Sequence, residues 1–154
     1  MATRKTSKPQ EATAMLRADH ARVSALFGMY DKSRSVEKKK TLLQSICQEL
    51  KVHTEIEETI FYPAVQGALK DHELVPEANV EHATIKSLIE QIDGGQPGPD
   101  EFEAKVKVMA EYVKHHVKEE HTEMFPKAKK TKLDMRALGA RMAERKAQLM
   151  ASPG

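Results

Sequence analysis

Six ionisable side chains that can bind metal ions recur at helical spacing along the 154-residue chain. Each falls on an apolar stripe that steps by threes and fours, so each is expected to face the interior of a helical protein. Burying six such groups is costly unless a partner satisfies them, and a bound cation would do so. The six candidate metal ligands are His20, His53, Glu57, His82, His116 and Glu120.

The spacing of these residues repeats in the two halves of the chain. His53 and Glu57 are four residues apart, which places both side chains on one helix face, about 6 Å apart along the axis. His116 and Glu120 repeat this spacing at an offset of 63 residues. The repeat predicts two helical hairpins of similar design, related by a pseudo-twofold axis.

The sequence around the candidate ligands repeats as well. The segments 53–63 and 116–126 both contain a histidine, a glutamate, a threonine, an aromatic residue and a proline at matching places. The pair Asp19-His20 recurs as Glu81-His82 at an offset of 62 residues. Each hairpin is therefore expected to supply two histidines and one carboxylate.

The turns determine the depth of these residues in the protein. Two residues of an antiparallel helix pair lie at one level when they are equally far from the connecting turn. The midpoint of His20 and His53 is position 36.5, just after a turn signal at 31–35. The midpoints of Glu57 and His82 (69.5) and of His82 and His116 (99) also fall in turn-rich segments, so all six groups can share one layer.

Four turn-rich segments separate the periodic stretches, at residues 31–35, 67–76, 94–99 and 127–132. The stretches between them show helical periodicity without strand alternation. Asp100 with Glu103 after the third turn resembles a capping box. We predict an all-α fold, an antiparallel up-down four-helix bundle with a short extra helix after Leu133. The expected organisation is a disordered basic N-terminus (1–10), the bundle (11–130) and a C-terminal helix and tail (131–154).

Composition places the chain among soluble globular proteins, with 40% hydrophobic and 31% charged residues. It contains no run of 18 apolar residues and no apolar segment after its basic start, so we expect neither a membrane span nor a signal peptide. The single cysteine, Cys47, excludes an intrachain disulfide framework and a cysteine-based zinc site. A reducing cytoplasm is the expected location.

Positive charge concentrates at the two ends of the chain. The net charge is +2, but residues 127–154 carry eight basic residues against two acidic ones, and residues 9–126 carry a net charge of −7. Basic tails can bind nucleic acid, but this one lacks interleaved aromatic residues and any nucleic-acid motif. We therefore interpret it as a solvated flank and expect no nucleic-acid partner.

The donor set narrows the choice of metal. Nitrogen and oxygen ligands without thiolate suit iron, manganese or zinc and disfavour copper(I) and iron–sulfur clusters. Two carboxylates can bridge two ions, as they do in di-iron bundle proteins. Two histidines per ion would leave an open position for a small molecule such as O2, NO or peroxide.

These motifs together resemble the hemerythrin-like family, also called the HHE cation-binding domain. The resemblance runs from about residue 11 to 126 and rests on the histidine and glutamate motifs and on the Phe-Tyr-Pro63 and Met-Phe-Pro126 segments. It implies two iron ions per chain (Fe2+/Fe3+, oxo- or hydroxo-bridged), with zinc or manganese as alternatives. His20 and His53 would then bind one iron, His82 and His116 the other, and Glu57 and Glu120 would bridge.

One position departs from the oxygen-carrying members of this family, which have a further histidine one turn after the ligand in the third helix. That position is Lys86 here, and a protonated lysine cannot be a ligand. The expected function is therefore binding of, or reaction with, O2, NO or hydrogen peroxide. The alternatives are a catalase- or peroxidase-like enzyme, an iron sensing, storage or iron-cluster repair module, and a structural metal bundle. A monomer or weak dimer is expected.

Other residues near the predicted site are open to alternative interpretations. His121, five residues after His116, is an alternative ligand, whereas Tyr62 is interpreted as a core or boundary aromatic residue. Glu58 and Glu119 neighbour the proposed bridges and could orient the rings of ligand histidines. His115 is expected to point about 100° away from its neighbour His116.

Overall fold

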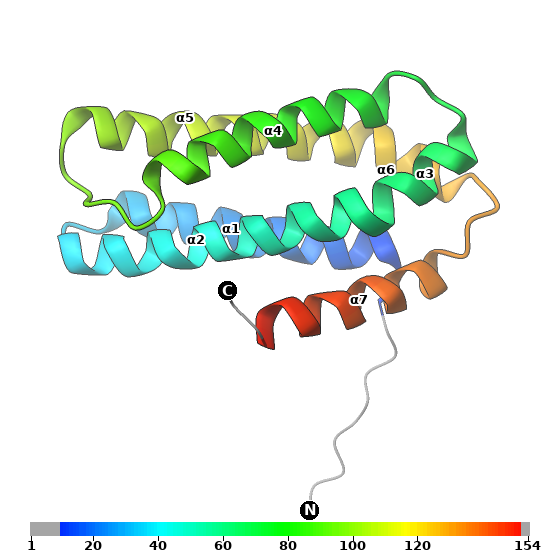
Figure 1. Cartoon of the computed structure of the whole chain (residues 1–154), viewed down its shortest axis with the longest axis horizontal. Helices are drawn as coiled ribbons and strands as arrows, with labels where there is room; N and C mark the ends of the chain where they lie inside the picture. The colour runs from blue at the N-terminus through cyan, green and yellow to red at the C-terminus, as the bar shows by residue number, and fades with distance from the viewer. Residues whose placement is uncertain (1–9, 152–154) are drawn as a thin grey trace, which may run out of the picture.

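The computed structural model describes residues 10–151, and every regular element in that range is helical. The predicted disorder of residues 1–10 falls almost entirely outside the described residues. Four long helices form two antiparallel hairpins that pack into a bundle, as predicted (Figure 1). The first hairpin consists of α1 (Ala12–Lys32) and α2 (Val36–Ile56), and the second of α4 (Leu74–Ile92) and α5 (Asp100–Glu119).

Two short π-helical segments extend α2 and α5, and the sequence analysis did not predict them. They are η1 (Glu57–Phe61) and η2 (Glu120–Met124), followed by the α-helical segments α3 (Tyr62–Leu69) and α6 (Phe125–Lys129). The amide of Tyr62 bonds to the carbonyl of Glu57, and that of Phe125 to the carbonyl of Glu120. A proline follows each of these amides, and proline has no N–H and crowds the carbonyl four residues earlier. The wider turn accommodates the proline without ending the helix.

The start of α5 differs from the predicted capping box. Pro99 is the residue that caps the helix, Asp100 is the first helical residue, and no side chain caps the helix start. Glu103 instead accepts hydrogen bonds from the Tyr30 hydroxyl and the Lys39 amine, both at 2.6 Å. These bonds connect the second hairpin to the first, so the carboxylate serves tertiary contact rather than capping.

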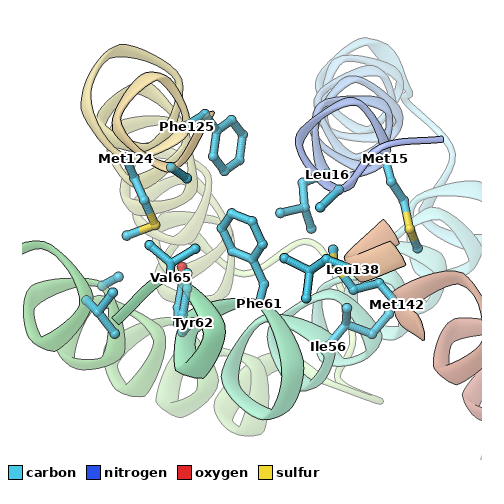
Figure 2. Close-up of a cluster of buried hydrophobic side chains, with 14 of the residues drawn as sticks. Met15, Leu16, Ile56, Phe61, Tyr62, Val65, Met124, Phe125, Leu138 and Met142 are labelled. Atoms are coloured by element: carbon cyan, nitrogen blue, oxygen red, sulfur yellow. The ribbon is translucent and has the colours of Figure 1, made fainter. Parts of the chain in front are cut away.

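Two apolar clusters fill the bundle, one on each side of the layer that contains the candidate ligands. The cluster near the first and third turns includes Val23, Leu50 and Ile85. The cluster at the other end is centred on Phe61 and Phe125, whose rings meet edge to face at 5.6 Å between centroids (Figure 2). The polar layer is therefore enclosed by apolar side chains along the bundle axis.

The predicted C-terminal helix is α7 (Met135–Ala151), and it lies along the first hairpin (Figure 1). Leu138 and Met142 are buried in the Phe61 cluster (Figure 2). Gly139 lets the helix approach the chain start closely, since a Cβ there would lie 2.1 Å from the carbonyl oxygen of Gln10. Within residues 10–151, no helix has both the length and the apolar character needed to cross a membrane.

Candidate metal centre

The structure brings the six predicted ligands together in one layer, and all are buried, with exposures of 9% or less. The histidines form two pairs whose Nε2 atoms face each other. His20 and His53, from the first hairpin, are 3.2 Å apart at these atoms. His82 and His116, from the second hairpin, are 3.1 Å apart. The predicted common depth is therefore confirmed.

Each buried carboxylate contacts one histidine of each pair. Oε1 of Glu57 lies 3.0 Å from His53 Nε2 and 3.1 Å from His82 Nε2. Oε1 of Glu120 lies 3.2 Å from His20 Nε2 and 3.4 Å from His116 Nε2. This arrangement fits two carboxylates that bridge two ions.

The donor geometry fits bound metal ions. Two nitrogen ligands at right angles, each about 2.1 Å from a shared ion, lie about 3.0 Å apart, close to the separation within each histidine pair. Two buried carboxylate oxygens, Glu57 Oε2 and Glu120 Oε1, have no hydrogen-bond partner among the described residues. Buried acceptors without a donor are costly, and a cation would satisfy both.

Three of the four histidines are oriented from behind by carboxylates. The Nδ1 atoms of His53, His82 and His116 lie 3.0, 2.9 and 2.8 Å from oxygens of other residues. A carboxylate only accepts, so each Nδ1 carries the proton and donates, which leaves Nε2 free to bind an ion. Asp19 accepts from His53, Glu58 accepts from His82, and Glu81 accepts from His116.

The fourth histidine, His20, has a different partner. Its Nδ1 lies 2.8 Å from Nε2 of the partly buried His121. His121 therefore stands behind a candidate ligand. The hypothesis that His121 is itself a ligand required it to lie among the inner donors, and it does not lie there. Burial and the charge of the neighbouring His53 lower the pKa of His20 to about 3, although the charge of Glu57 acts in the opposite direction.

The other inner groups shift in the opposite direction. Burial alone would lower the pKa of His53 and His116, but the nearby Glu57 and Glu120 charges raise these pKa values to about 10 and about 11. Burial and the adjacent Glu57 charge raise the pKa of Glu120 well above its ordinary value. Burial opposes ionisation of Glu57 too, yet His53 and hydrogen bonds hold its pKa well below the ordinary value. Without metal, protons therefore occupy the centre.

Tyr62 is a site residue that the sequence analysis missed. Its ring is buried as expected, but its hydroxyl donates to Glu120 Oε2 at 2.9 Å and lies 3.2 Å from Glu57 Oε1. The same oxygen is 3.2 Å from His82 Nε2 and 3.0 Å from His116 Nε2. In an α-helix, residues five apart point about 140° away from each other. The π-helical turn η1 removes this offset and brings Tyr62 over Glu57.

The two glutamates next to the proposed bridges, Glu58 and Glu119, have different partners. Glu58 orients a ligand ring as expected, and its second oxygen forms an ion pair with Lys86 at 2.6 Å. Glu119 does not orient a ligand; it pairs at 2.9 Å with His115, whose exposed ring points away from the layer. The prediction for Glu119 was wrong because the carboxylate behind His116 comes from α4 of the same hairpin, at Glu81.

A small cavity adjoins the imidazoles, and Tyr62 is not among the residues that line it. Its volume is about 20 Å³, enough for one water-sized molecule. Apolar side chains form much of the wall, among them Val23, Leu50, Ile85 and Val113. The four candidate ligand histidines, Asp19 and Thr54 form the polar part.

The protein family follows from a match over most of the chain. The hemerythrin HHE cation binding domain matches residues 11–128. The chain belongs to this family. A hemerythrin HHE cation binding domain-containing protein from Mycobacterium kansasii has the same fold, with a TM-score of 0.79 and 22% identity; the alignment covers 92% of this chain and 88% of that one. The HHE domain and its buried histidine and glutamate cluster together indicate a metal-cation site.

A curated relative contains a similar segment within a longer protein. The DNA nickase of Nostoc sp. (strain PCC 7120) is 31% identical to this HHE domain over 111 residues, which are 72% of this chain. The match covers 31% of the nickase. This chain therefore corresponds to about a third of that protein's length.

Proposed function

We propose that this HHE domain is a non-heme di-iron protein that binds or reacts with a small oxidant, namely O2, NO or hydrogen peroxide. The observation that carries the proposal is a pair of bis-histidine sites, spanned by two carboxylates, next to a cavity that holds one small molecule. In this proposal His20 and His53 hold one ion, His82 and His116 the other, and Glu57 and Glu120 bridge.

The residues that line the cavity limit the size and polarity of the molecules that can reach this centre. An iron pair, when bound, would supply electrons and polarise a small ligand. The apolar wall and the size of the cavity favour a neutral molecule of two to four atoms over a larger substrate. A polynucleotide cannot reach donors that are 9% exposed or less, so we do not extend the nickase activity of the longer relative to this chain.

A peroxide-decomposing reaction is the second candidate, and Tyr62 favours it. Cleavage of an O–O bond to water consumes protons, and the Tyr62 hydroxyl is a buried O–H among four of the inner donor atoms. Burial and the two glutamates raise the pKa of Tyr62 well above its ordinary value, so the proton is retained at neutral pH. Tyr62 can therefore hold a proton beside the centre.

The test measures the reaction of the iron-loaded protein with small oxidants, both in the wild type and in a variant with a smaller cavity. Iron-loaded protein is mixed with peroxide or with NO, while oxygen evolution and the optical spectrum are followed. Val113→Leu adds about one methylene group to the cavity wall, and we expect unchanged iron content with a reaction slowed about tenfold or more. Val108→Leu, at an exposed position of the same helix, is the matched control.

The outcomes separate the two candidates. Repeated oxygen evolution from peroxide supports the enzyme, whereas a reversible spectral change with NO or O2 without turnover supports the binding protein. Iron-loaded protein whose spectrum responds to none of the three molecules would contradict both.

A further inference from the structure

The C-terminal helix α7 sends one charged side chain into the polar layer of the bundle. The amine of Lys146 lies 2.6 Å from Asp19 Oδ1, and the Asp19 side chain is only 3% exposed. The other oxygen of Asp19 accepts from His53 Nδ1 at 3.0 Å. A chain of contacts therefore runs from α7 through one carboxylate to a candidate metal ligand.

The docking of α7 fixes the position of this lysine. Leu138 and Met142 pack between the first hairpin and Phe61 (Figure 2), and Gly139 sits against the backbone of Gln10 and Ala12. These contacts hold the first half of the helix rigidly on α1 and α2. Lys146 follows one helical turn after Met142 on the same side, so its amine is delivered to Asp19 with little freedom.

The second hairpin has a different outer partner at the equivalent place. Glu81 corresponds to Asp19 in the repeat and accepts from His116 Nδ1 at 2.8 Å. Its other oxygen lies 3.5 Å from His115, which is largely exposed and belongs to the same hairpin. Helix α7 thus supports the His20–His53 pair through the amine of Lys146, whose side chain is 21% exposed, and it gives the His82–His116 pair no such support among the described residues.

We propose that Lys146 is a positioning residue for the ion held by His20 and His53. This proposal rests on the di-iron centre proposed above. Lys146 and His53 hold the two oxygens of Asp19, so the plane of the carboxylate is fixed and Nε2 of His53 is kept aimed at the ion. Arg22 also contacts Asp19, at 3.2 Å, but its side chain is 43% exposed and gives a looser anchor.

A link between α7 and metal retention follows from this arrangement. Binding of an ion at the His20–His53 pair and docking of the second half of α7 stabilise each other, because both depend on the same orientation of Asp19. The ion at the His82–His116 pair does not share this dependence. The two ions of one chain should therefore respond differently to a change at Lys146.

The experiment measures the release of metal from the full chain loaded with cobalt(II), whose visible absorption reports its ligands. Excess chelator is added, and the release of each ion is followed. Lys146→Met keeps the apolar stem of the side chain and removes the charge. We expect one ion to leave about tenfold faster, with a shifted absorption band, while the other leaves at the wild-type rate. Lys146→Arg should restore most of the slow release.

Arg145→Met is the matched control, because the one hydrogen bond of the Arg145 side chain within residues 10–151 is to Gln148 of the same helix. It should leave both rates unchanged. If Lys146→Met leaves both rates unchanged, or accelerates both equally, the positioning role is wrong. Wild-type protein that takes up fewer than two cobalt ions would overturn the proposed two-ion centre instead, so the two failures are distinguishable.

Discussion

The first helical hairpin, α1 with α2, and the second, α4 with α5, supply the centre with the same inner donors. Each gives two histidines, and each continues into a π-helical turn that starts with a glutamate. The carboxylates behind the rings repeat as well, since Asp19 accepts from His53 as Glu81 accepts from His116. The proposed pair of ions requires two similar sets of donors, which would explain why these parts are alike.

Two differences close to the centre lie at positions that the 63-residue offset makes equivalent. Glu58 stands behind His82, whereas its counterpart His121 stands behind His20. The hydroxyl of Tyr62 lies at the centre, whereas its counterpart Phe125 has no hydroxyl and packs its ring against His20 and Phe61, with the Arg17 guanidinium over its face. The His82–His116 pair therefore has more anionic and hydroxyl oxygen around it. This difference predicts two inequivalent ions within a nearly symmetric frame.

The largest expected effect is a loss of bound metal on removal of a carboxylate that contacts the histidines of both hairpins. Glu57→Ala deletes a carboxylate that contacts both histidine pairs, so we expect both ions to be lost, not one. Metal analysis of the purified variant measures this, with Glu90→Ala on the exposed face of α4 as control. Two ions per chain in Glu57→Ala would show that this residue is not a bridge.

The second expected effect is a pH dependence of the free energy of unfolding that is large without metal and nearly absent with metal bound. Without metal, the raised pKa values of His53 and His116 stabilise the fold fully below their ordinary pKa of 6.5, and this stability is lost as the pH rises through about 10 to 11. Metal binding requires these groups and Glu120 without protons. Loading should therefore release about two protons, one from each imidazole, besides any proton held by Glu120, and affinity for the ion pair should rise about a hundredfold per pH unit.

Thermal unfolding with and without metal, between about pH 7 and pH 9, measures both trends. The metal-free protein should lose stability across this range. The metal-saturated protein should keep a nearly constant stability, because above about pH 7 these protons are largely absent both from it and from the unfolded chain. Proton release on loading can be followed in weak buffer. Parallel trends in the two states would contradict the assignment of protons to the empty centre.

The smallest of the three effects should be confined to one half. Tyr62→Phe makes the start of α3 resemble the start of α6 by removing the hydroxyl, and we expect the ion at His82–His116 to dissociate about tenfold faster than in the wild type. The ion at His20–His53 should be little affected. Tyr112→Phe, at an exposed tyrosine of α5, is the control. Equal acceleration of both ions would mean that Tyr62 acts on the bundle as a whole.

Much of the bundle and of its inner layer could be predicted because they depend on periodicity. The spacing of His53 and Glu57 and the positions of the turns determine which residues face inward and at what depth, and the structure agrees. The all-α bundle with a C-terminal helix is confirmed. The ligand roles of the six residues stay a prediction until a metal is located.

The rest depended on features that helical periodicity does not contain. Tyr62 was missed because a π-helical turn changes the angle between residues five apart, and the proline after it was the only signal of that turn. Lys146 was missed because its contact spans 127 residues and depends on how α7 docks. Glu103 was assigned to a helix cap because its tertiary partners, Tyr30 and Lys39, are far away in the sequence.

The most direct test of the central claim is anomalous diffraction at the iron edge from crystals of iron-loaded protein. We predict two peaks per chain inside the bundle, one between the Nε2 atoms of His20 and His53 and one between those of His82 and His116. A map without a peak at either pair, or with the iron held only at exposed side chains, would contradict the proposed centre.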